Sequence, residues 1–405
     1  MNGLNPTRAR LLETFGLDVE LTRGDGCKLY DAAGREYLDF LSQYGALPFG
    51  HNPSQIWKAL NLQQEAMQPV MVQPLRAVGA ERLANRLASI TPHDLSVVSL
   101  ANSGAEAVEA AIKLARARSG RDIILSTHNG FHGKTMGALS ATGKPMYQKD
   151  FGGPARDFEY IAFGDIEELE AKLEADHGSI AAFIVEPIQG EGGLNAASDA
   201  WMQGIEKIAR KHGALLIIDD IQAGCGRSGS FFSFEASGIK PDMITQAKSL
   251  SGFGLPFAAL LIAPEHDIWK PAEHNGTFRG NTHAFVTARV AIEKFWSDDK
   301  FEKSLAEKAV LLTTALKDVA DLVDGATLKG RGLMQGVDVG SGELAGAICA
   351  RAYELGLVIE TSGANDEIVK YLAPLTTPEK VMREGFDILL QATRDVTGNM
   401  KLAAE

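Results

Sequence analysis

Cysteine is scarce in this chain, and the few that occur form no pattern. Cys27, Cys225 and Cys349 are the only three in 405 residues, and they lie far apart in the sequence. Closely paired cysteines are typical of zinc sites, and a high cysteine density is typical of small secreted domains held by disulfides. We therefore expect neither a metal site nor a disulfide framework.

Long apolar runs and an excess of positive charge are also lacking. No run approaches the ~20 apolar residues of a membrane-spanning helix, and the amino terminus has no charged-then-apolar signal pattern. The formal net charge is -12 and no dense basic stretch occurs, which argues against a nucleic-acid-binding surface. We expect a soluble, cytoplasmic protein that binds neither membranes nor nucleic acids.

Hydrophobic residues are present in ordinary amount. They make up 45% of a chain whose length is sufficient for two or three domains with a large core. Neither a short-period repeat nor a low-complexity linker divides the sequence.

One lysine stands at the end of a short apolar strand. Residues 242–254 read DMITQAKSLSGFG, so that Lys248 closes the strand and small residues follow at once. Open α/β sheets place their ligand crevice at the carboxyl ends of strands. A lysine in such a dry site loses solvation of its charged form, and the neutral amine becomes a nucleophile toward aldehydes. The alternative is an ordinary surface lysine.

A second buried strand, upstream of the first, ends in acid. Residues 214–222 read ALLIIDDIQ, with Asp219 and Asp220 at the strand end. A carboxylate that faces a pyridine nitrogen keeps the ring protonated, and a lysine in reach of the ring's aldehyde forms a Schiff base. These are the two groups that pyridoxal 5'-phosphate (PLP) chemistry requires. Because adjacent strand residues point to opposite faces, only one acid can face the ring. The place of Asp219 in the run, together with the family resemblance given next, favours Asp219.

These residues belong to a longer pattern. Residues 219–229 (DDIQAGCGRSG), followed by Lys248, resemble the signature of the class III (ω-amino acid) PLP-dependent aminotransferases, and further motifs keep the expected order from Tyr30 to Pro374. The resemblance implies an α/β, fold-type-I PLP transferase. Its large PLP-binding domain, assigned to residues 51–299, holds a mostly parallel seven-stranded sheet. A smaller α/β domain combines residues 1–50, including an amino-terminal hairpin, with residues 300–405.

A turn of small residues opens a helix after the strand at residues 95–100. The turn and helix start read ANSGAEA at residues 101–107. Unpaired backbone N–H groups and the helix dipole make such a turn an anion site, although similar turns also serve as ordinary helix caps. By resemblance, Ser103, Gly104 and Ala105 hold the cofactor phosphate.

The resemblance also assigns residues around the cofactor ring. Phe131 matches a ring-stacking position, where offset stacking contributes ~1 kcal/mol beyond burial. His132 is implied to shape the ring pocket, while the lysine acts as the base. Glu186 is implied to lie near the ring, and Gln222 to hydrogen-bond the ring hydroxyl.

Four residues are implied to bind the substrate. Tyr44 either lines the entrance or packs under its loop. Glu191 matches a glutamate that neutralises an arginine for one substrate and swings away for the other. At the position of that arginine the chain has Lys370. Lysine offers a carboxylate a point charge, whereas arginine forms two parallel hydrogen bonds. Either Lys370 binds the carboxylate less rigidly, or Arg279 supplies part of the binding. The alternatives are a solvated Glu191 and an exposed Lys370.

The segment after Lys248 predicts a shared active site. Thr277 matches a threonine that reaches the phosphate of the partner subunit, which implies a homodimer. The Phe278–Asn281 version of this motif (FRGN) resembles the diaminobutyrate–2-oxoglutarate branch more than the ornithine or 4-aminobutyrate branches.

The resemblance therefore implies a transaminase. The terminal amino group of an ω-amino acid such as 2,4-diaminobutyrate would pass to or from 2-oxoglutarate and glutamate, in a ping-pong reaction through the lysine Schiff base. Ornithine, 4-aminobutyrate or a natural-product aldehyde as substrate, or an aminomutase of the same fold, remain alternatives. A nicotinamide dehydrogenase is disfavoured because no G-x-G-x-x-G follows a first strand. A non-catalytic relative would be expected to have lost the lysine or the acid.

Overall fold

A seven-stranded sheet forms the centre of the molecule. The computed structural model describes residues 19–175 and 178–404. The strand order is β4-β10-β9-β8-β7-β5-β6, and every neighbouring pair is parallel except those of β10, which is antiparallel to β4 and β9. The strands are β4 (Val97–Ala101), β5 (Ile123–Thr127), β6 (Phe158–Ile161), β7 (Ile180–Val185), β8 (Leu215–Asp219), β9 (Met243–Gln246) and β10 (Ala258–Ile262). The prediction of a mostly parallel seven-stranded sheet is confirmed.

Two four-stranded sheets lie apart from the central one. The first has the order β1-β2-β3-β13, with β1 (Leu21–Asp25), β2 (Lys28–Asp31), β3 (Glu36–Asp39) and β13 (Leu357–Val358). The second has the order β11-β12-β15-β14, with β11 (Thr327–Arg331), β12 (Met334–Asp338), β14 (Glu360–Ser362) and β15 (Ile368–Tyr371). Because β13 pairs in parallel with β3, segments from both halves of the chain share one sheet. Residues 1–18 of the expected small domain lie outside the described residues.

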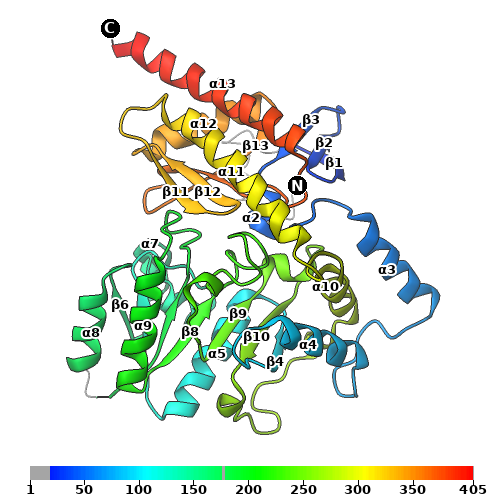
Figure 1. Ribbon diagram of the computed structural model, residues 1–405, viewed down its shortest axis with the longest axis vertical. Coiled ribbons are helices and arrows are strands. Elements are labelled where there is room, and N and C mark those ends of the chain that lie inside the picture. The colour runs from blue at the N-terminus through cyan, green and yellow to red at the C-terminus, as the bar shows by residue number, and fades with distance from the viewer. Residues whose placement is uncertain (1–18, 176–177, 405) are drawn as a thin grey trace.

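Helices cover the sheets. Figure 1 shows the two small sheets gathered with α11, α12 and α13 at one end of the molecule, and the seven-stranded sheet at the other. The helices are α2 (Ser42–Gly45), α3 (Ser54–Glu65), α4 (Val78–Ile90), α5 (Gly104–Ser119), α6 (Met136–Ala141), α7 (Pro145–Gln148), α8 (Ile166–Ala175), α9 (Asp199–His212), α10 (Thr282–Phe295), α11 (Lys300–Ala320), α12 (Gly342–Glu354) and α13 (Glu379–Ala404). Short 3₁₀ helices include η3 (Lys248–Ser251) and η5 (Thr277–Gly280).

Strand β8 shows how the sequence sets the direction of the side chains. Every residue of β8 is buried, as expected for a strand covered on both faces. Leu216 and Ile218 pack into one core cluster, whereas Leu215 and Ile217 pack into the cluster that contains α5. Since side chains alternate along a strand, Asp219 points to the face that α5 covers.

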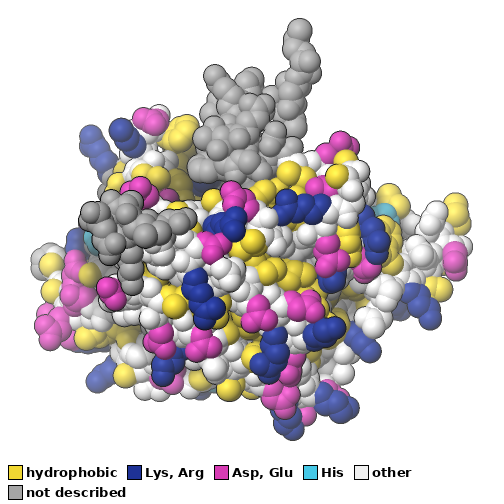
Figure 2. All heavy atoms as spheres, turned by 90° about the horizontal axis from the view of Figure 1, so that it is seen from above, with side chains coloured by type: hydrophobic (Ala, Val, Ile, Leu, Met, Phe, Trp, Pro, Cys, Tyr) yellow, Lys and Arg dark blue, Asp and Glu magenta, His cyan; other side chains and the backbone are white. Residues whose placement is uncertain are grey.

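Charge is mixed on the surface. On the face shown in Figure 2, Lys and Arg side chains are interspersed with Asp and Glu, and no area of one sign stands out. Among the described residues, no helix is long and apolar enough to span a membrane. The same residues contain no group of three or more His, Cys, Asp or Glu side chains that could hold a metal ion.

Helix α13 packs closely on the first small sheet at a glycine. A Cβ added to Gly385 would lie 2.1 Å from the Cζ atom of Phe40. The Phe40 ring is fully buried and contacts the rings of Tyr371 and Phe386, at centroid distances of 4.9 and 5.7 Å. The aromatic cluster therefore leaves no room for a side chain at this position.

We predict that Gly385→Ala destabilises the protein by about 1–3 kcal/mol because it overpacks this cluster. Gly346→Ala in α12 is the matched control, since a Cβ there meets no atom within 4 Å. The control should be neutral or stabilising by about 0.5–1 kcal/mol, because alanine favours helix interiors. Thermal melts of both variants test this; equal melting temperatures would contradict the packing argument.

Candidate active site

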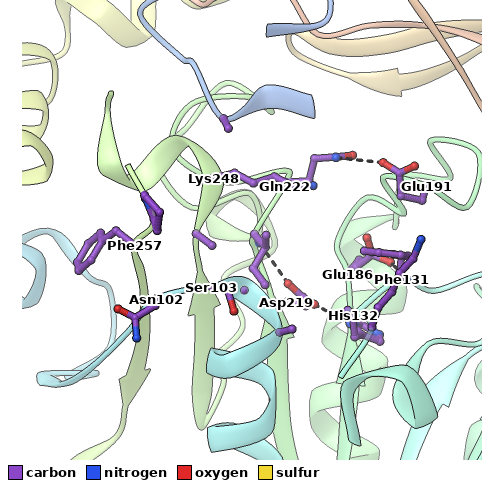
Figure 3. A pocket seen from close by; sticks show the side chains of 18 of the residues that line it. Asn102, Ser103, Phe131, His132, Glu186, Glu191, Asp219, Gln222, Lys248 and Phe257 are labelled. Carbon is purple, nitrogen blue, oxygen red and sulfur yellow. Dashed lines mark hydrogen bonds and ion pairs between the residues drawn. The ribbon is translucent and has the colours of Figure 1, made fainter. Parts of the chain in front are cut away.

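The two sequence-predicted groups of the reaction centre lie at one edge of the central sheet. Asp219 ends β8, and Lys248 follows the neighbouring parallel strand β9, whose Thr245 pairs with Asp219. Because the strands are parallel, their carboxyl ends meet at the same edge. Both residues line one cavity of about 460 Å³, shown in Figure 3.

Most of the expected site residues line this cavity, and some do not. Those in its wall are Ser103, Gly104, Ala105, Phe131, His132, Glu186, Glu191, Asp219, Gln222 and Lys248. Tyr44, Thr277, Arg279 and Lys370 are not part of that wall. The structure thus brings the expected cofactor residues together, except for Thr277, and separates them from most of the expected substrate residues.

Lys248 is held in an unusual backbone conformation. Its φ angle is 46°, in the left-handed region that costs a non-glycine residue on the order of 1 kcal/mol. Burial lowers the pKa of its amine, and the charge of Glu191 opposes this shift. Lowering the pKa increases the fraction of neutral, nucleophilic amine.

Asp219 is fixed by three donors. His132 Nδ1 lies 2.6 Å from Asp219 Oδ2, and the Thr245 hydroxyl and the Ile221 N–H donate to Oδ1 at 3.1 and 3.2 Å. Figure 3 shows the contact between Asp219 and His132 at the cavity floor. Burial alone would lower the pKa of His132, but the hydrogen bond and charge of Asp219 and the charge of Glu186 raise it overall. The raised pKa favours a protonated imidazole at His132, which then donates to Asp219.

The neighbouring acid points away from the cavity. Asp220 accepts from the Gln246 amide at 2.7 Å and from the backbone N–H and hydroxyl of Ser233. It is absent from the cavity wall. The two adjacent carboxylates are therefore separated by strand alternation, as the sequence predicts.

Glu186 ties two loops together beneath the cavity. Its carboxylate accepts from the Phe131 N–H at 2.9 Å and from the Gly190 N–H at 3.0 Å. Burial raises the pKa of Glu186 to about 7, against the opposing charge of His132. Glu186 thereby positions the loop that carries Phe131 in the wall.

The expected phosphate turn is built as a helix cap. Ser103 caps α5 by accepting from the Glu106 N–H at 3.2 Å. The Glu106 side chain in turn accepts from the Asn102 N–H at 2.7 Å and pairs with Arg279, whose Nη2 lies 2.6 Å away. Arg279 therefore supports the turn through Glu106 and does not reach the cavity.

The other expected substrate residues lie around the cavity. Tyr44 is 53% exposed, and its backbone carbonyl accepts from the Gln222 amide at 3.4 Å. Lys370 is completely buried, and its ammonium lies 3.1 Å from Glu191 Oε1. Thr277 is exposed on η5. Lys370 can thus touch a ligand in the cavity only after Glu191 has moved.

Sequence reasoning missed Lys134. It lines the cavity and is exposed, with its Nζ 4.2 Å from the ring centroid of Tyr147 and 5.8 Å from that of Phe131. The available signal was its place three residues after Phe131, in a loop already expected to contact the cofactor. Lys134 gives the wall a cation besides Lys248 and His132.

The residues present fit PLP. The cavity volume of about 460 Å³ lies in the usual range for small-ligand sites. Two buried polar atoms of the wall, Gln222 Oε1 and His132 Nε2, have no hydrogen-bond partner among the described residues. Gln222 Oε1 can accept from a ring hydroxyl, Asp219 can hold a ring nitrogen, and the start of α5 can hold a phosphate.

The fold and this set of residues define an aminotransferase. The chain belongs to the family Aminotransferase class-III, whose profile matches residues 13–393. Membership implies PLP as cofactor, and the substrates of a transaminase are amines and keto acids.

Named relatives lie within this family. The chain is 43% identical to a diaminobutyrate–2-oxoglutarate transaminase of Halomonas elongata over 396 residues, which covers 93% of this chain and 94% of that protein. It is also 43% identical to the enzyme of that name in Vibrio cholerae, over 90% of this chain and 92% of the other.

Solved structures share the fold. A transaminase from the marine bacterium Virgibacillus superposes with a TM-score of 0.89 at 23% identity, covering 99% of this chain and 97% of the other. An ornithine aminotransferase from Toxoplasma gondii gives 0.84 at 26% identity, covering 95% and 92%.

We predict that Asp219→Asn weakens PLP binding by roughly 10- to 100-fold, since it removes a charge-assisted hydrogen bond. Titration of the purified variant with PLP, followed by visible absorbance, measures this. Asp220→Asn is the matched control: it makes the same substitution on the opposite face of β8, where burial raises the pKa of Asp220 to about 8, and it should leave PLP affinity unchanged. A larger loss of affinity in the control would show that the wrong acid has been assigned.

Proposed function

We propose that this chain transfers the terminal amino group of 2,4-diaminobutyrate, or of a similar ω-amino acid, to or from 2-oxoglutarate and glutamate. The observation that carries the proposal is the placement of Lys248 and Asp219 in one cavity, at the ends of adjacent parallel strands. The choice of substrate is supported by relatives of 39–43% identity that bear the name diaminobutyrate–2-oxoglutarate transaminase.

We propose the following roles in the chemistry. When bound, PLP supplies an aldehyde that condenses with amines and a ring that delocalises negative charge. Asp219, oriented by His132, would hold the proton on the ring nitrogen. Lys248 Nζ, whose pKa is lowered by burial, would remove the proton from the amine-bearing carbon of the substrate. Phe131 would pack against the ring and exclude water.

The phosphate would be held from two sides. Ser103, Gly104 and Ala105 supply the start of α5 on this subunit. We propose that Thr277 of the partner subunit completes the site in a homodimer. Exposed apolar side chains near the turn support the proposal that a partner subunit covers this surface. Val70, Met71 and Phe278 line a second cavity of about 580 Å³ together with Asn102.

We also propose the division of the chain into domains. Residues 51–299 contain the cavity-lining residues except Ala46, and they would form the PLP-binding domain. Residues 1–50 and 300–405 would form the smaller domain, which is supported by the shared sheet of β3 and β13.

The substrate carboxylate would meet Lys134. This is the exposed cation of the cavity wall, whereas Arg279 is paired with Glu106 and Lys370 is buried behind Glu191. For the keto acid, the expected alternative is that Glu191 swings away and Lys370 provides a second point charge.

An amine panel tests the proposed function. The holoenzyme is mixed with 2,4-diaminobutyrate, ornithine or 4-aminobutyrate and with 2-oxoglutarate, and glutamate is measured. We expect one glutamate per amine consumed, fastest with 2,4-diaminobutyrate, and no turnover with Lys248→Ala. Amine conversion without glutamate would indicate an aminomutase, and full activity of Lys248→Ala would refute the catalytic lysine.

The role of Lys134 gives a separate prediction. Lys134→Gln should raise the KM of the amino acid by about tenfold with little change in kcat, because it removes binding made equally in ground and transition states. Lys149→Gln, at an exposed lysine outside the cavity wall, is the control and should behave as wild type. A fall in kcat at unchanged KM would contradict a carboxylate-binding role.

A further inference from the structure

A single buried ammonium lies between two carboxylates at the edge of the cavity. Lys370 Nζ lies 3.1 Å from Glu191 Oε1 and 2.9 Å from Glu360 Oε1, and it donates to the Gly190 carbonyl at 3.1 Å. Glu360 stands directly opposite Lys370 in the β14–β15 ladder. The contact between Lys370 and Glu360 has the distance of an ion pair. Glu360 Oε1 nevertheless makes no hydrogen bond of suitable geometry among the described residues. No role for Glu360 was predicted from the sequence.

The two carboxylates differ in what they face. Glu191 lines the cavity and its side chain is 23% exposed, whereas Glu360 lies outside the cavity wall and is 13% exposed. Burial would raise the pKa of Glu191, but the charges of Lys370 and Lys248 lower it to about 2. Of the two carboxylates around Lys370, Glu191 is therefore the one that a ligand in the cavity meets, and its lowered pKa keeps it ionised.

Two carboxylates share one ammonium in this cluster. Burial raises the pKa of Glu360, and the charges of Lys370 and Lys248 oppose that rise. When both acids are ionised, Lys370 alone cannot cancel both, so some negative charge of Glu191 remains directed at the cavity. If Glu191 left, Lys370 would still be paired with Glu360, and the vacated place would offer no uncompensated cation to a carboxylate. In a site with a single acid, departure of that acid would leave an unpaired buried cation, which is strongly unfavourable. Because the second acid is present, this part of the cavity wall is better suited to bind an ammonium group of the substrate than a carboxylate.

We propose that Glu360, by sharing the charge of Lys370, leaves Glu191 with surplus negative charge at the cavity wall, and that Glu191 binds the second ammonium group of a diamino acid. This rests on the proposed function. Glu191 is then a specificity-determining residue, and Glu360 is a positioning residue that touches no substrate. The carboxylate beside the second ammonium would meet Lys134, which lines the same cavity.

Two amines that differ by one group test the proposal. 4-Aminobutyrate is 2,4-diaminobutyrate without the second ammonium. Calorimetric Kd values for both are measured at pH 8 on PLP-loaded Lys248→Ala, in which no turnover obscures binding. We expect this protein to bind 2,4-diaminobutyrate at least about tenfold more tightly, as expected for a hydrogen bond between charged groups.

Substitutions in the same background then separate the two acids. Glu191→Gln should bring the Kd ratio to within about threefold of unity, mainly by weakening 2,4-diaminobutyrate. Glu360→Gln should lower the ratio by at least about threefold, because Lys370 then cancels Glu191 one to one, and Glu360→Asp should restore part of the ratio. Glu343→Gln removes an exposed charge from the start of α12 and should leave the ratio unchanged.

Several results would overturn the proposal. They are a parental ratio near one, equal losses for both amines in Glu191→Gln, or a Glu360→Gln ratio at or above the parental value. Glutamine is nearly isosteric with glutamate, and the more exposed Glu191 provides the test that depends least on folding. A different result would contradict the proposed function: the holoenzyme with Lys248 intact would transfer the amino group of neither amine to 2-oxoglutarate.

Discussion

The pairing of β8 with β9 is the constraint on which the site depends. Two buried parallel strands end at the same edge, so Asp219, the last residue of β8, and Lys248, the second residue after β9, line one cavity. Neither Asp219 nor Lys248 needs a long reach, and both are removed from bulk water. The same strand geometry turns Asp220 to the opposite face, where Ser233 and Gln246 hold it. The geometry of the sheet edge thus places Asp219, and not Asp220, in the same cavity as Lys248.

Around this pair, other polar residues hold the side chains and loops of the site in place. His132 fixes Asp219 from beneath, Glu186 holds the backbone of Phe131, and Glu106 joins Arg279 to the turn before α5. Each contact links segments far apart in sequence. The cavity is therefore shaped by two buried carboxylates, Asp219 and Glu186, and the half-buried Glu106, which accept from backbone or side-chain donors and restrain the loops at strand ends.

The placement of Asp219 and Lys248 in one cavity could be predicted from the sequence because its signals are local. A buried apolar strand that ends in a single acid or lysine predicts where the side chain will lie, and a turn of small residues before a helix predicts an anion site at Ser103. The mostly parallel sheet followed from the family resemblance. Ion-pair partners could not be predicted in this way. Arg279 meets Glu106, and Lys370 meets Glu360, through tertiary packing that no spacing in the chain encodes. Lys134 could not be singled out because it lies in a loop, where spacing in the sequence does not set the direction of a side chain.

The central claim is that Lys248 is the residue whose amine joins the cofactor. The most direct measurement is to load the purified protein with PLP, reduce it with borohydride, digest it and identify the modified peptide by mass spectrometry. The account predicts one phosphopyridoxyl group, on the peptide that contains Lys248. A modification on another lysine, or none at all, would contradict it.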